Sequence, residues 1–180
     1  MVPSSIDDWL KVMRAVAPRG KDWILLGMAD NMPIMIERFK INTVNRQAHF
    51  LGQCGHESDG FQTTEEYASG AAYENRKDLG NTKPGDGKRF KGRGVIQLTG
   101  RYNYEKASMS LGEDYLATPE VVAKFPHAAL VSGWFWDHNS LHAHADRNDH
   151  RAVTKTINGG YTHLDRRIAA TEAARKVLIA

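Results

Sequence analysis

The sequence predicts a single, mainly α-helical domain. Apolar residues recur at helical spacing along most of the chain, helix-capping residues precede many of these stretches, and only the run VIQLT at 95–99 has the pattern of a short strand. With 180 residues the chain is long enough for one hydrophobic core but short for two. We therefore expect one domain over residues 1–180, with at most a small β-hairpin beside a glycine-rich loop.

The first two helices are predicted from a cap and from apolar spacing. Ser5 and Asp8 have the spacing of a capping box, and the apolar stripe that follows them stops at Pro18. A second apolar segment, DWILLGMADNMPIMIERF, contains Pro33. Because proline lacks the amide proton that a helix interior needs, Pro33 should kink or split this helix near Met32.

The third helix is expected to end at a glutamate. Thr43 can cap this helix, and Glu57 lies near its C-terminal end. Its expected buried stripe consists of Val44, Ala48, Leu51 and Gly55. Ser69 can cap a short helix, and residues 78–94 then form a polar, glycine-rich loop.

Helical sequence resumes after the predicted strand and continues to the end of the chain. The expected segments are 102–111, 118–122, 126–141, 149–157 and 164–180. The helix at 126–141 contains the aromatic run from Trp134 to Trp136. Its surroundings are apolar, so we expect these rings to pack in the core and not to stack on a ligand.

Composition and charge narrow the possible classes of protein. The net charge of +3 and the pI near 9.0 fit either modest affinity for anionic polymers or ordinary solubility charge. No Lys/Arg tract interleaved with aromatics points to nucleic acid, and no apolar run approaches the ~20 residues that span a bilayer. Asp7 and Asp8 stand where a cleavable signal peptide would be basic, so we expect none. The single Cys54 excludes an internal disulfide, suits a reducing cytoplasm and is expected to be a small buried residue.

The segment 52–81 concentrates carboxylates. It contains Glu57, Glu65, Glu66 and Glu74. Hydrolysis of a glycosidic bond requires one protonated carboxyl and a second, ionised one that activates water or acts as nucleophile. Glu57 lies at a helix end between glycines and Phe61, where desolvation would favour a general acid. On composition alone, solvated surface remains the alternative for all four.

Downstream residues favour the catalytic interpretation. In FKGRGVIQLTGRYNY, glycines at 92, 94 and 100 permit close backbone approach. Four polar side chains in the same run could bind sugar hydroxyls and N-acetyl groups: Gln97, Thr99, Tyr102 and Asn103.

Four segments in order resemble glycoside hydrolase family 19, and most closely the small phage and prophage endolysins of that family. They are AHFLGQCGHESDGF, YENRKDLGN, GDGKRFKGRGVIQLTGRYNY, and INGG followed by DRRI, and together they extend from about Asn45 to Arg167. The resemblance implies a lysozyme-like fold of two helical lobes with a central substrate cleft.

The resemblance also implies roles for individual residues. Glu57 matches the family's general acid. The second glutamate, which activates water in an inverting mechanism, matches Glu74 by the YE-x-R-x-DLGN pattern, whereas endolysin-like relatives place it nine residues after the first, at Glu66. We rank Glu57 first, Glu74 second and Glu66 third, and expect Glu65 to be solvated surface.

Other positions match substrate-binding or supporting residues of the family. Thr99 matches the hydroxyl that positions water, and Asn103 matches an amide ligand of the substrate. Gln97 and Tyr102 match sugar-binding positions. Asn158 and Arg167 match residues that hold the region of the second glutamate, so we expect the guanidinium beside Glu74, where it would keep that base ionised. His56 is expected either to orient the acid or to be a hydrogen-bonded core histidine.

Departures from the plant chitinases of the family favour another substrate. The disulfides and the cleft-lengthening loops are absent, Phe61 replaces a tryptophan, and Tyr161 replaces an acidic residue. These differences disfavour long chitin chains. We therefore expect an endolysin with lysozyme activity that cleaves β-1,4 bonds of peptidoglycan by inversion, with chitin oligomers as the alternative.

The endolysin resemblance further implies where the protein acts. It would be made in the host cytoplasm and reach the periplasmic peptidoglycan after release or export, as a monomer without a separate wall-binding domain. We expect no cofactor, no nucleic-acid partner and no stable membrane insertion.

Two other classes remain open. A zinc-dependent peptidoglycan amidase could use His138 and His142 at i, i+4 spacing with His144, Asp146 and His150 nearby, but there is no HExxH motif and we expect no metal. A non-enzymatic sugar-binding module would need no pair of acids. Cys54 has no visible histidine and acid partners for nucleophilic catalysis.

Overall fold

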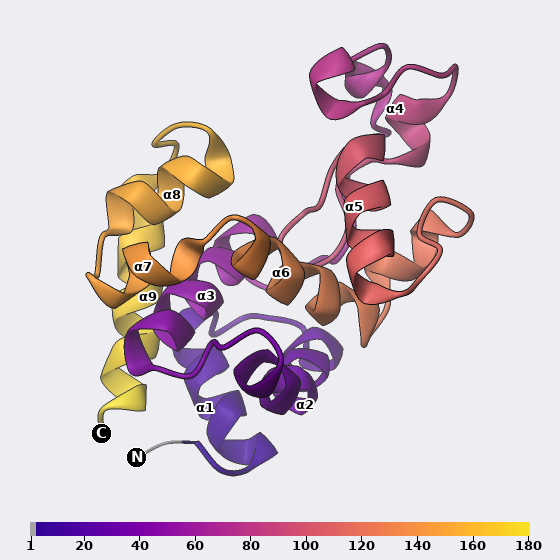
Figure 1. Cartoon of the computed structure of the whole chain (residues 1–180). Helices are drawn as coiled ribbons and strands as arrows, with labels where there is room; N and C mark the ends of the chain where they lie inside the picture. Colours follow the sequence, from indigo (N-terminus) through magenta and orange to yellow (C-terminus); the bar gives the residue numbers. More distant parts are fainter. Residues whose placement is uncertain (1–2) are drawn as a thin grey trace.

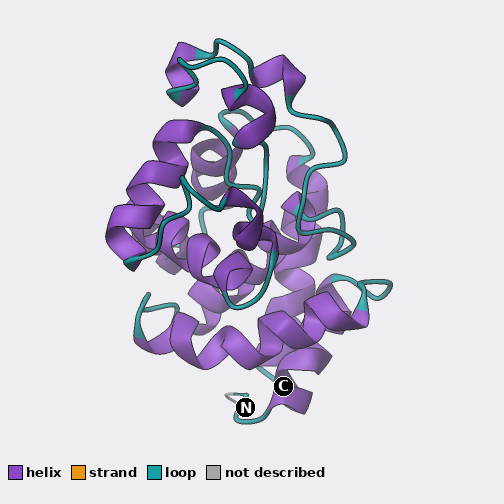
Figure 2. Ribbon diagram, turned by 90° about the vertical axis from the view of Figure 1, so that its right-hand side faces the viewer, coloured by secondary structure: helices purple, strands orange, loops and turns teal. Residues whose placement is uncertain are grey.

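The computed structural model describes residues 3–180, and its regular structure is helical (Figure 1, Figure 2). The α-helices are α1 (Ile6–Val16), α2 (Asp22–Glu37), α3 (Val44–Glu57), α4 (Asp86–Arg89), α5 (Arg101–Leu111), α6 (His127–His138), α7 (Leu141–Asp146), α8 (His150–Asn158) and α9 (Leu164–Leu178). Three short 3-10 helices are η1 (Ala71–Tyr73), η2 (Lys77–Leu79) and η3 (Pro119–Ala123). The predicted mainly α class is confirmed.

The helices form two lobes of unequal size (Figure 1). α1, α2, α3, α7, α8 and α9 make the larger lobe, and α4 and α5 stand apart from them. α6 runs between the two groups and packs against both α2 and α5. Among residues 3–180, no helix is long and apolar enough to cross a membrane.

Local signals at the helix starts are formed as predicted. Ser5 Oγ accepts a hydrogen bond from the Asp8 amide at 3.2 Å, and Thr43 Oγ1 accepts one from the Arg46 amide at 3.2 Å. Each bond satisfies an amide that a helix start leaves without a backbone partner. These caps fix the starts of α1 and α3.

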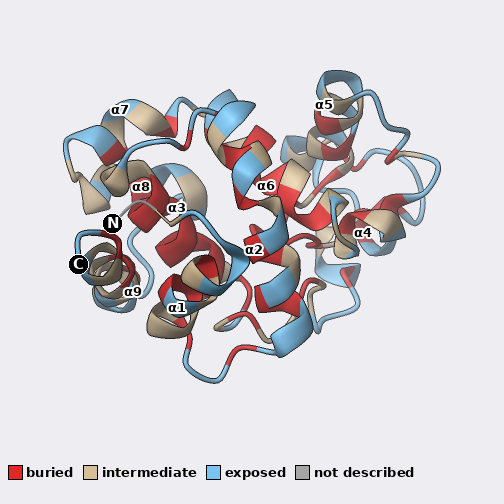
Figure 3. Cartoon of the chain, turned by 90° about the horizontal axis from the view of Figure 1, so that it is seen from below, coloured by how far each residue is buried: buried red, intermediate tan, exposed pale blue. Residues whose placement is uncertain are grey.

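The central helix α3 is buried on more sides than the predicted stripe. All of residues 47–55 are buried, and α3 packs most extensively against α9. Gly52 permits this approach, because a Cβ there would lie 2.4 Å from Thr171 Oγ1. Figure 3 shows that buried segments gather on α2, α3 and α6 in the interior. Trp134 and Trp136 belong to this core, as predicted.

The predicted split of the second helix does not occur. α2 continues through Pro33 to Glu37 as one helix. Proline removes one backbone hydrogen bond, but burial of Met28, Met32 and Met35 on this helix offsets the loss.

The predicted strand at 95–99 is wrong. Residues 94–97 form a turn that is closed by paired backbone bonds between Arg93 and Leu98, at 3.1 and 2.8 Å. The chain reverses because Gly94 and Gln97 have positive φ values of 76° and 58°. The apolar side chain of Val95 is buried in the core, although the residue does not lie in a sheet.

Candidate active site

Glu57, the last residue of α3, is paired with a buried arginine. Its Oε1 lies 2.6 Å from Nη1 of Arg167, and the two side chains are 20% and 3% exposed. The hydrogen bond of that nitrogen goes to Gln53 Oε1 at 2.6 Å, and Arg167 Nε donates to the Thr162 carbonyl at 3.1 Å. Gln53 in turn donates to Thr154 Oγ1 at 3.2 Å. The glutamate is therefore held by a polar chain that joins α3, α9 and α8.

This position of Arg167 corrects the sequence-based expectation. The guanidinium lies beside Glu57 and not beside Glu74. The physical reason is the packing of α9 on α3, which brings the start of α9 to the end of α3. Arg167 thus supports the first glutamate.

Glu74 is fully engaged by backbone amides. Its Oε1 accepts from the Gly85 amide at 2.7 Å and its Oε2 from the Gly87 amide at 2.8 Å. Gly87 must be glycine for this approach, because a Cβ there would lie 2.5 Å from the Glu74 amide nitrogen. These bonds attach Glu74 to the start of α4, in the smaller lobe and well separated from α3 in Figure 1. In this position the carboxylate closes a loop.

Glu66 lies in the segment that leads from α3 to the smaller lobe. Its Oε1 accepts from the Tyr73 hydroxyl at 3.0 Å and its Oε2 from the Gly92 amide at 3.1 Å. A Cβ at Gly92 would lie 2.9 Å from Gln97 Oε1 and 3.3 Å from Glu66 Oε2. Because Gly92 has no side chain, the side chains of Glu66 and Gln97 can both lie against it. Burial, followed by the bond to Glu66, raises the pKa of Tyr73, so its hydroxyl stays a donor.

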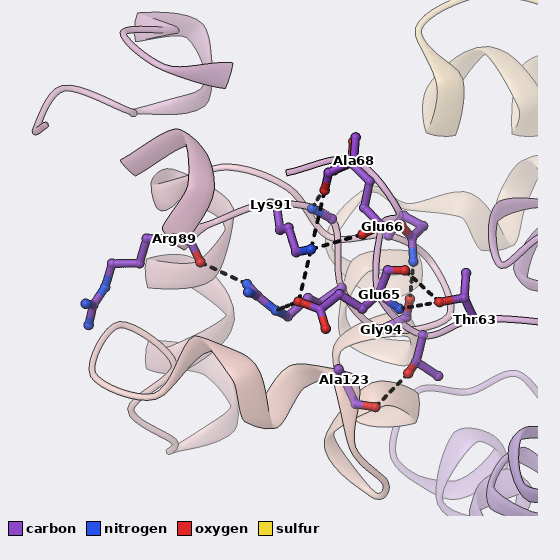
Figure 4. A network of polar contacts seen from close by, with 12 residues as sticks. Thr63, Glu65, Glu66, Ala68, Arg89, Lys91, Gly94 and Ala123 are labelled. Carbon is purple, nitrogen blue, oxygen red and sulfur yellow. Dashed lines mark hydrogen bonds and ion pairs between the residues drawn. The ribbon is translucent and has the colours of Figure 1, made fainter. Parts of the chain in front are cut away.

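Glu65 is not free solvated surface, although its side chain is 43% exposed. Its Oε1 lies 3.0 Å from Arg93 Nε and 3.3 Å from Lys91 Nζ. Figure 4 shows Glu65 and Glu66 with Lys91, which also donates to the Glu66 carbonyl at 3.0 Å. The turn hydroxyl of Thr63 accepts from the Glu65 amide at 3.1 Å. Glu65 thus fixes the segment that carries Glu66.

The polar residues before and within α5 are connected to one another. Thr99 Oγ1 donates to the Gln97 carbonyl at 2.9 Å, and Asn103 Nδ2 donates to the Thr99 carbonyl at 2.8 Å. Gln97 Nε2 donates to the Gly94 carbonyl at 3.0 Å. Tyr102 is 50% exposed, with Lys106 Nζ 4.3 Å from its ring centre. The structure thus brings Thr99, Gln97 and Asn103 together, and of these Gln97 lies next to Glu66.

His56 and Asn158 are on the side of α8 and α9. His56 is half-buried, and its ring centre lies 5.4 Å from that of His163. Burial, and then the positive charge of Arg167, lowers the pKa of His56 to about 4, so the ring is neutral at neutral pH. Asn158 ends α8 and is exposed.

The remaining candidates have other partners. His142 Nδ1 accepts from Trp136 Nε1 at 3.2 Å, Asp146 pairs with Arg46 at 2.6 Å, and His150 Nε2 lies 3.3 Å from Glu172. Within residues 3–180, no three His, Cys, Asp or Glu side chains are placed to hold a metal ion. Cys54 is buried, and burial raises the pKa of its thiol well above the usual value.

Comparisons with known proteins agree with this architecture. The family model described as chitinase class I, glycoside hydrolase family 19, matches residues 29–166. A glycosyl hydrolase family 19 domain-containing protein of Haemophilus influenzae is 32% identical over 161 residues, which cover 71% of this chain and 78% of that protein. An endochitinase of Arabidopsis thaliana is 38% identical over 127 residues, which cover 70% of this chain but 43% of the plant protein. The chain thus spans less than half of that plant relative.

Solved structures share the fold. Chitinase C from Streptomyces griseus has a TM-score of 0.74 at 22% identity, covering 96% of this chain and 78% of that one. A bacterial family 19 chitinase has a TM-score of 0.73 at 20% identity, covering 93% and 92%. The matched family model covers more than half of the chain, and this chain therefore belongs to glycoside hydrolase family 19.

Proposed function

We propose that this glycoside hydrolase cleaves β-1,4 bonds of bacterial peptidoglycan by inversion, with Glu57 as general acid and Glu66 as general base. The observation that carries the assignment of the base is the contrast between two carboxylates. Both oxygens of Glu74 are bonded to the amides of Gly85 and Gly87 in the smaller lobe. Both oxygens of Glu66 are bonded as well, to the Tyr73 hydroxyl and the Gly92 amide, but Glu66 also lies next to Gln97, whose carbonyl accepts from Thr99 Oγ1.

The surroundings of Glu57 suit a group that exchanges a proton. Its Oε1 contacts the Arg167 guanidinium, and its side chain is only 20% exposed. In the proposed reaction Glu57 gives its proton to the leaving glycosidic oxygen. Glu66 takes a proton from water, Thr99 helps to place that water, and the water attacks the anomeric carbon from the opposite face. This geometry requires a carboxyl separation of roughly 6.5–9.5 Å in the complex.

Peptidoglycan is preferred to chitin on two features of this chain. Phe61, at the position of a plant tryptophan, is fully buried and offers no ring to a sugar. Tyr161, at the position of an acidic residue, is 43% exposed with the Arg151 guanidinium 4.2 Å from its ring centre. The second candidate, hydrolysis of chitin oligomers, is favoured by the relatives that are named chitinases. We further propose an endolysin role, with synthesis in a host cytoplasm and action on periplasmic peptidoglycan.

The test is digestion of purified sacculi and of chitin oligomers, with mass spectrometry of the fragments and NMR of the first product anomer. We expect disaccharide-peptide fragments from sacculi and an inverted, α-configured new reducing end. Glu57→Gln and Glu66→Gln should each abolish release, and Glu113→Gln, which changes an exposed carboxylate outside the site, is the matched control. Free peptides without glycan cleavage would indicate an amidase, and turnover of chitin alone would support the second candidate.

A further inference from the structure

Two cavities adjoin the end of α3 and form one groove. The first, of about 730 Å³, is lined by residues 16–19 at the end of α1 and by Asp59 and Gln62. The second, of about 290 Å³, continues to His56 and Arg166. Both are lined by Val16, Asp59 and Gly60, so they are parts of a single depression, which we call the basic groove.

Close packing of α1 on the end of α3 shapes the basic groove. A Cβ at Gly55 would lie 2.7 Å from Val16 Cγ1, so the two helices meet there without an intervening side chain. The chain then turns sharply away from α3. Asp59 and Gly60 have positive φ values of 55° and 68°, and the Gly60 amide donates to the Gly55 carbonyl at 2.7 Å. The floor of the groove is therefore backbone and small residues.

Two guanidinium groups on the rim have no carboxylate partner. Arg19 and Arg166 are both exposed, and neither forms an ion pair within residues 3–180. Arg14, which is close in sequence, is by contrast paired with Asp22. Asp59 supplies one negative charge, and its Oδ2 accepts from the Tyr67 hydroxyl at 3.1 Å. The groove thus offers two unpaired cations and one anion to a ligand.

The basic groove lies immediately beside the proposed acid. His56 lines the groove, and the next residue is Glu57. Arg166 lines it too, and the next residue, Arg167, contacts Glu57. Consecutive helical residues point about 100° apart, so α9 presents one arginine to the acid and one to the groove. A substituent on a sugar that is bound at Glu57 could therefore enter the groove.

We propose that the basic groove binds the stem peptide of peptidoglycan, with Arg19 and Arg166 pairing with its carboxylates and Asp59 with the amine of its diamino acid. This inference rests on the proposed function and extends it. Every second sugar of peptidoglycan carries a short peptide with several free carboxylates, whereas chitin carries only neutral N-acetyl groups. Guanidinium pairs with carboxylates in charge-assisted, often two-pronged hydrogen bonds. The groove would therefore discriminate between the two polymers.

The kinetic test compares two substrates made from the same glycan strands, one with its stem peptides and one from which an amidase has removed them. For Arg166→Ala and Arg19→Ala, kcat/KM on peptide-bearing strands should fall by roughly three- to tenfold more than on bare strands. Higher salt should reduce this difference. Lys124→Ala removes an exposed cation that does not line the groove and should leave the ratio unchanged.

A binding test separates failure of this inference from failure of the proposed function. Free stem tetrapeptide is titrated into Glu57→Gln protein, and amide NMR shifts are followed. We expect shifts confined to residues around Asp59 and Arg166, and their loss in the Arg19→Ala, Arg166→Ala double variant. The stem-peptide site would be overturned if the arginine variants lost kcat/KM equally on both substrates, or if the free peptide caused no amide NMR shifts. Full activity of Glu57→Gln on bare strands would instead overturn the proposed function.

Discussion

Arg167 Nη1 lies 2.6 Å from Glu57 Oε1 and joins the start of α9 to the end of α3. The same nitrogen donates to Gln53 Oε1, also at 2.6 Å. One planar guanidinium therefore serves both the acid and the helix that carries it. A lysine could not reproduce this, because its ammonium is a point charge on a flexible chain.

Arg167→Lys should lower kcat by about 100-fold with little change in KM, because a shift of about 1 Å in a catalytic group has this effect. Arg167→Met should lower kcat further and also destabilise the fold. Breaking a buried ion pair leaves an uncompensated charge and costs about 3–5 kcal/mol. Steady-state kinetics and thermal melts of the three proteins check both effects. Wild-type kcat in Arg167→Met would show that the pair does not position Glu57.

Glu66 and Glu74 should respond differently to the same substitution. Glu66→Gln should abolish turnover while the melting temperature changes little, because the glutamine oxygen can accept from the Gly92 amide and its N–H can donate to the Tyr73 hydroxyl, which is also an acceptor. Glu74→Gln should keep a large share of the activity but lower the melting temperature. Its amide would place an N–H against the amide of Gly85 or Gly87, and a hydrogen bond to a charged group is worth about 1.5–3 kcal/mol.

The contrast is measured by assaying sacculus hydrolysis and melting temperature on the same preparations. If Glu74→Gln were inactive and folded while Glu66→Gln remained active, Glu74 would be the base. That outcome would agree with the ranking from sequence resemblance, which places Glu74 before Glu66.

Local sequence signals predicted the helical class and several helix starts. Ser5 and Thr43 cap helices through bonds to residues three positions away, and such short-range chemistry is visible in the sequence. The prediction of a strand at 95–99 was wrong because apolar β-branched residues suit both a strand and a buried turn. Only the backbone shows Gln97 at positive φ.

Contacts between residues far apart in the chain could not be predicted from the spacing of residues in the sequence. Resemblance to the family identified Arg167 as important, yet its contact with Glu57 depends on how α9 packs on α3. The environments of Glu66 and Glu74 likewise depend on amides at 85–92, within the glycine-rich segment. The basic groove combines segments after α1, after α3 and in α9, so no single motif predicts it.

Gln97→Gly should impair catalysis with little net change in stability. Gln97 has a φ of 58°, a conformation that glycine adopts without strain, and relief of strain worth up to about 1 kcal/mol offsets the loss of the bond from Gln97 Nε2 to the Gly94 carbonyl. The loss of the side chain that faces Glu66 should lower kcat/KM. Lys40→Gly, at a φ of 53° in the turn between α2 and α3, is the matched control and should affect stability alone. Equal kcat/KM values in the two variants would show that Gln97 does not contribute to the active site.

A buried histidine should make the fold sensitive to acid. His49 is fully buried, its Nε2 lies 2.8 Å from Asn148 Oδ1, and its Nδ1 has no partner. Burial lowers the pKa of His49 from 6.5 to about 4. Between these values the unfolded chain binds a proton that the folded chain does not. The contribution of His49 to stability is therefore complete above pH 6.5 and is lost as the pH falls toward 4.

His49→Gln can keep the bond to Asn148 without titrating, so it isolates this effect. Urea unfolding of both proteins at pH 7 and pH 5 gives the free energies of unfolding. The wild type should lose about 2 kcal/mol more than the variant over this interval. His150, whose ring centre is 4.5 Å away, and Glu172 are unchanged in the variant, so the comparison isolates position 49. Equal losses in the two proteins would show that His49 is protonated in the folded state at pH 5.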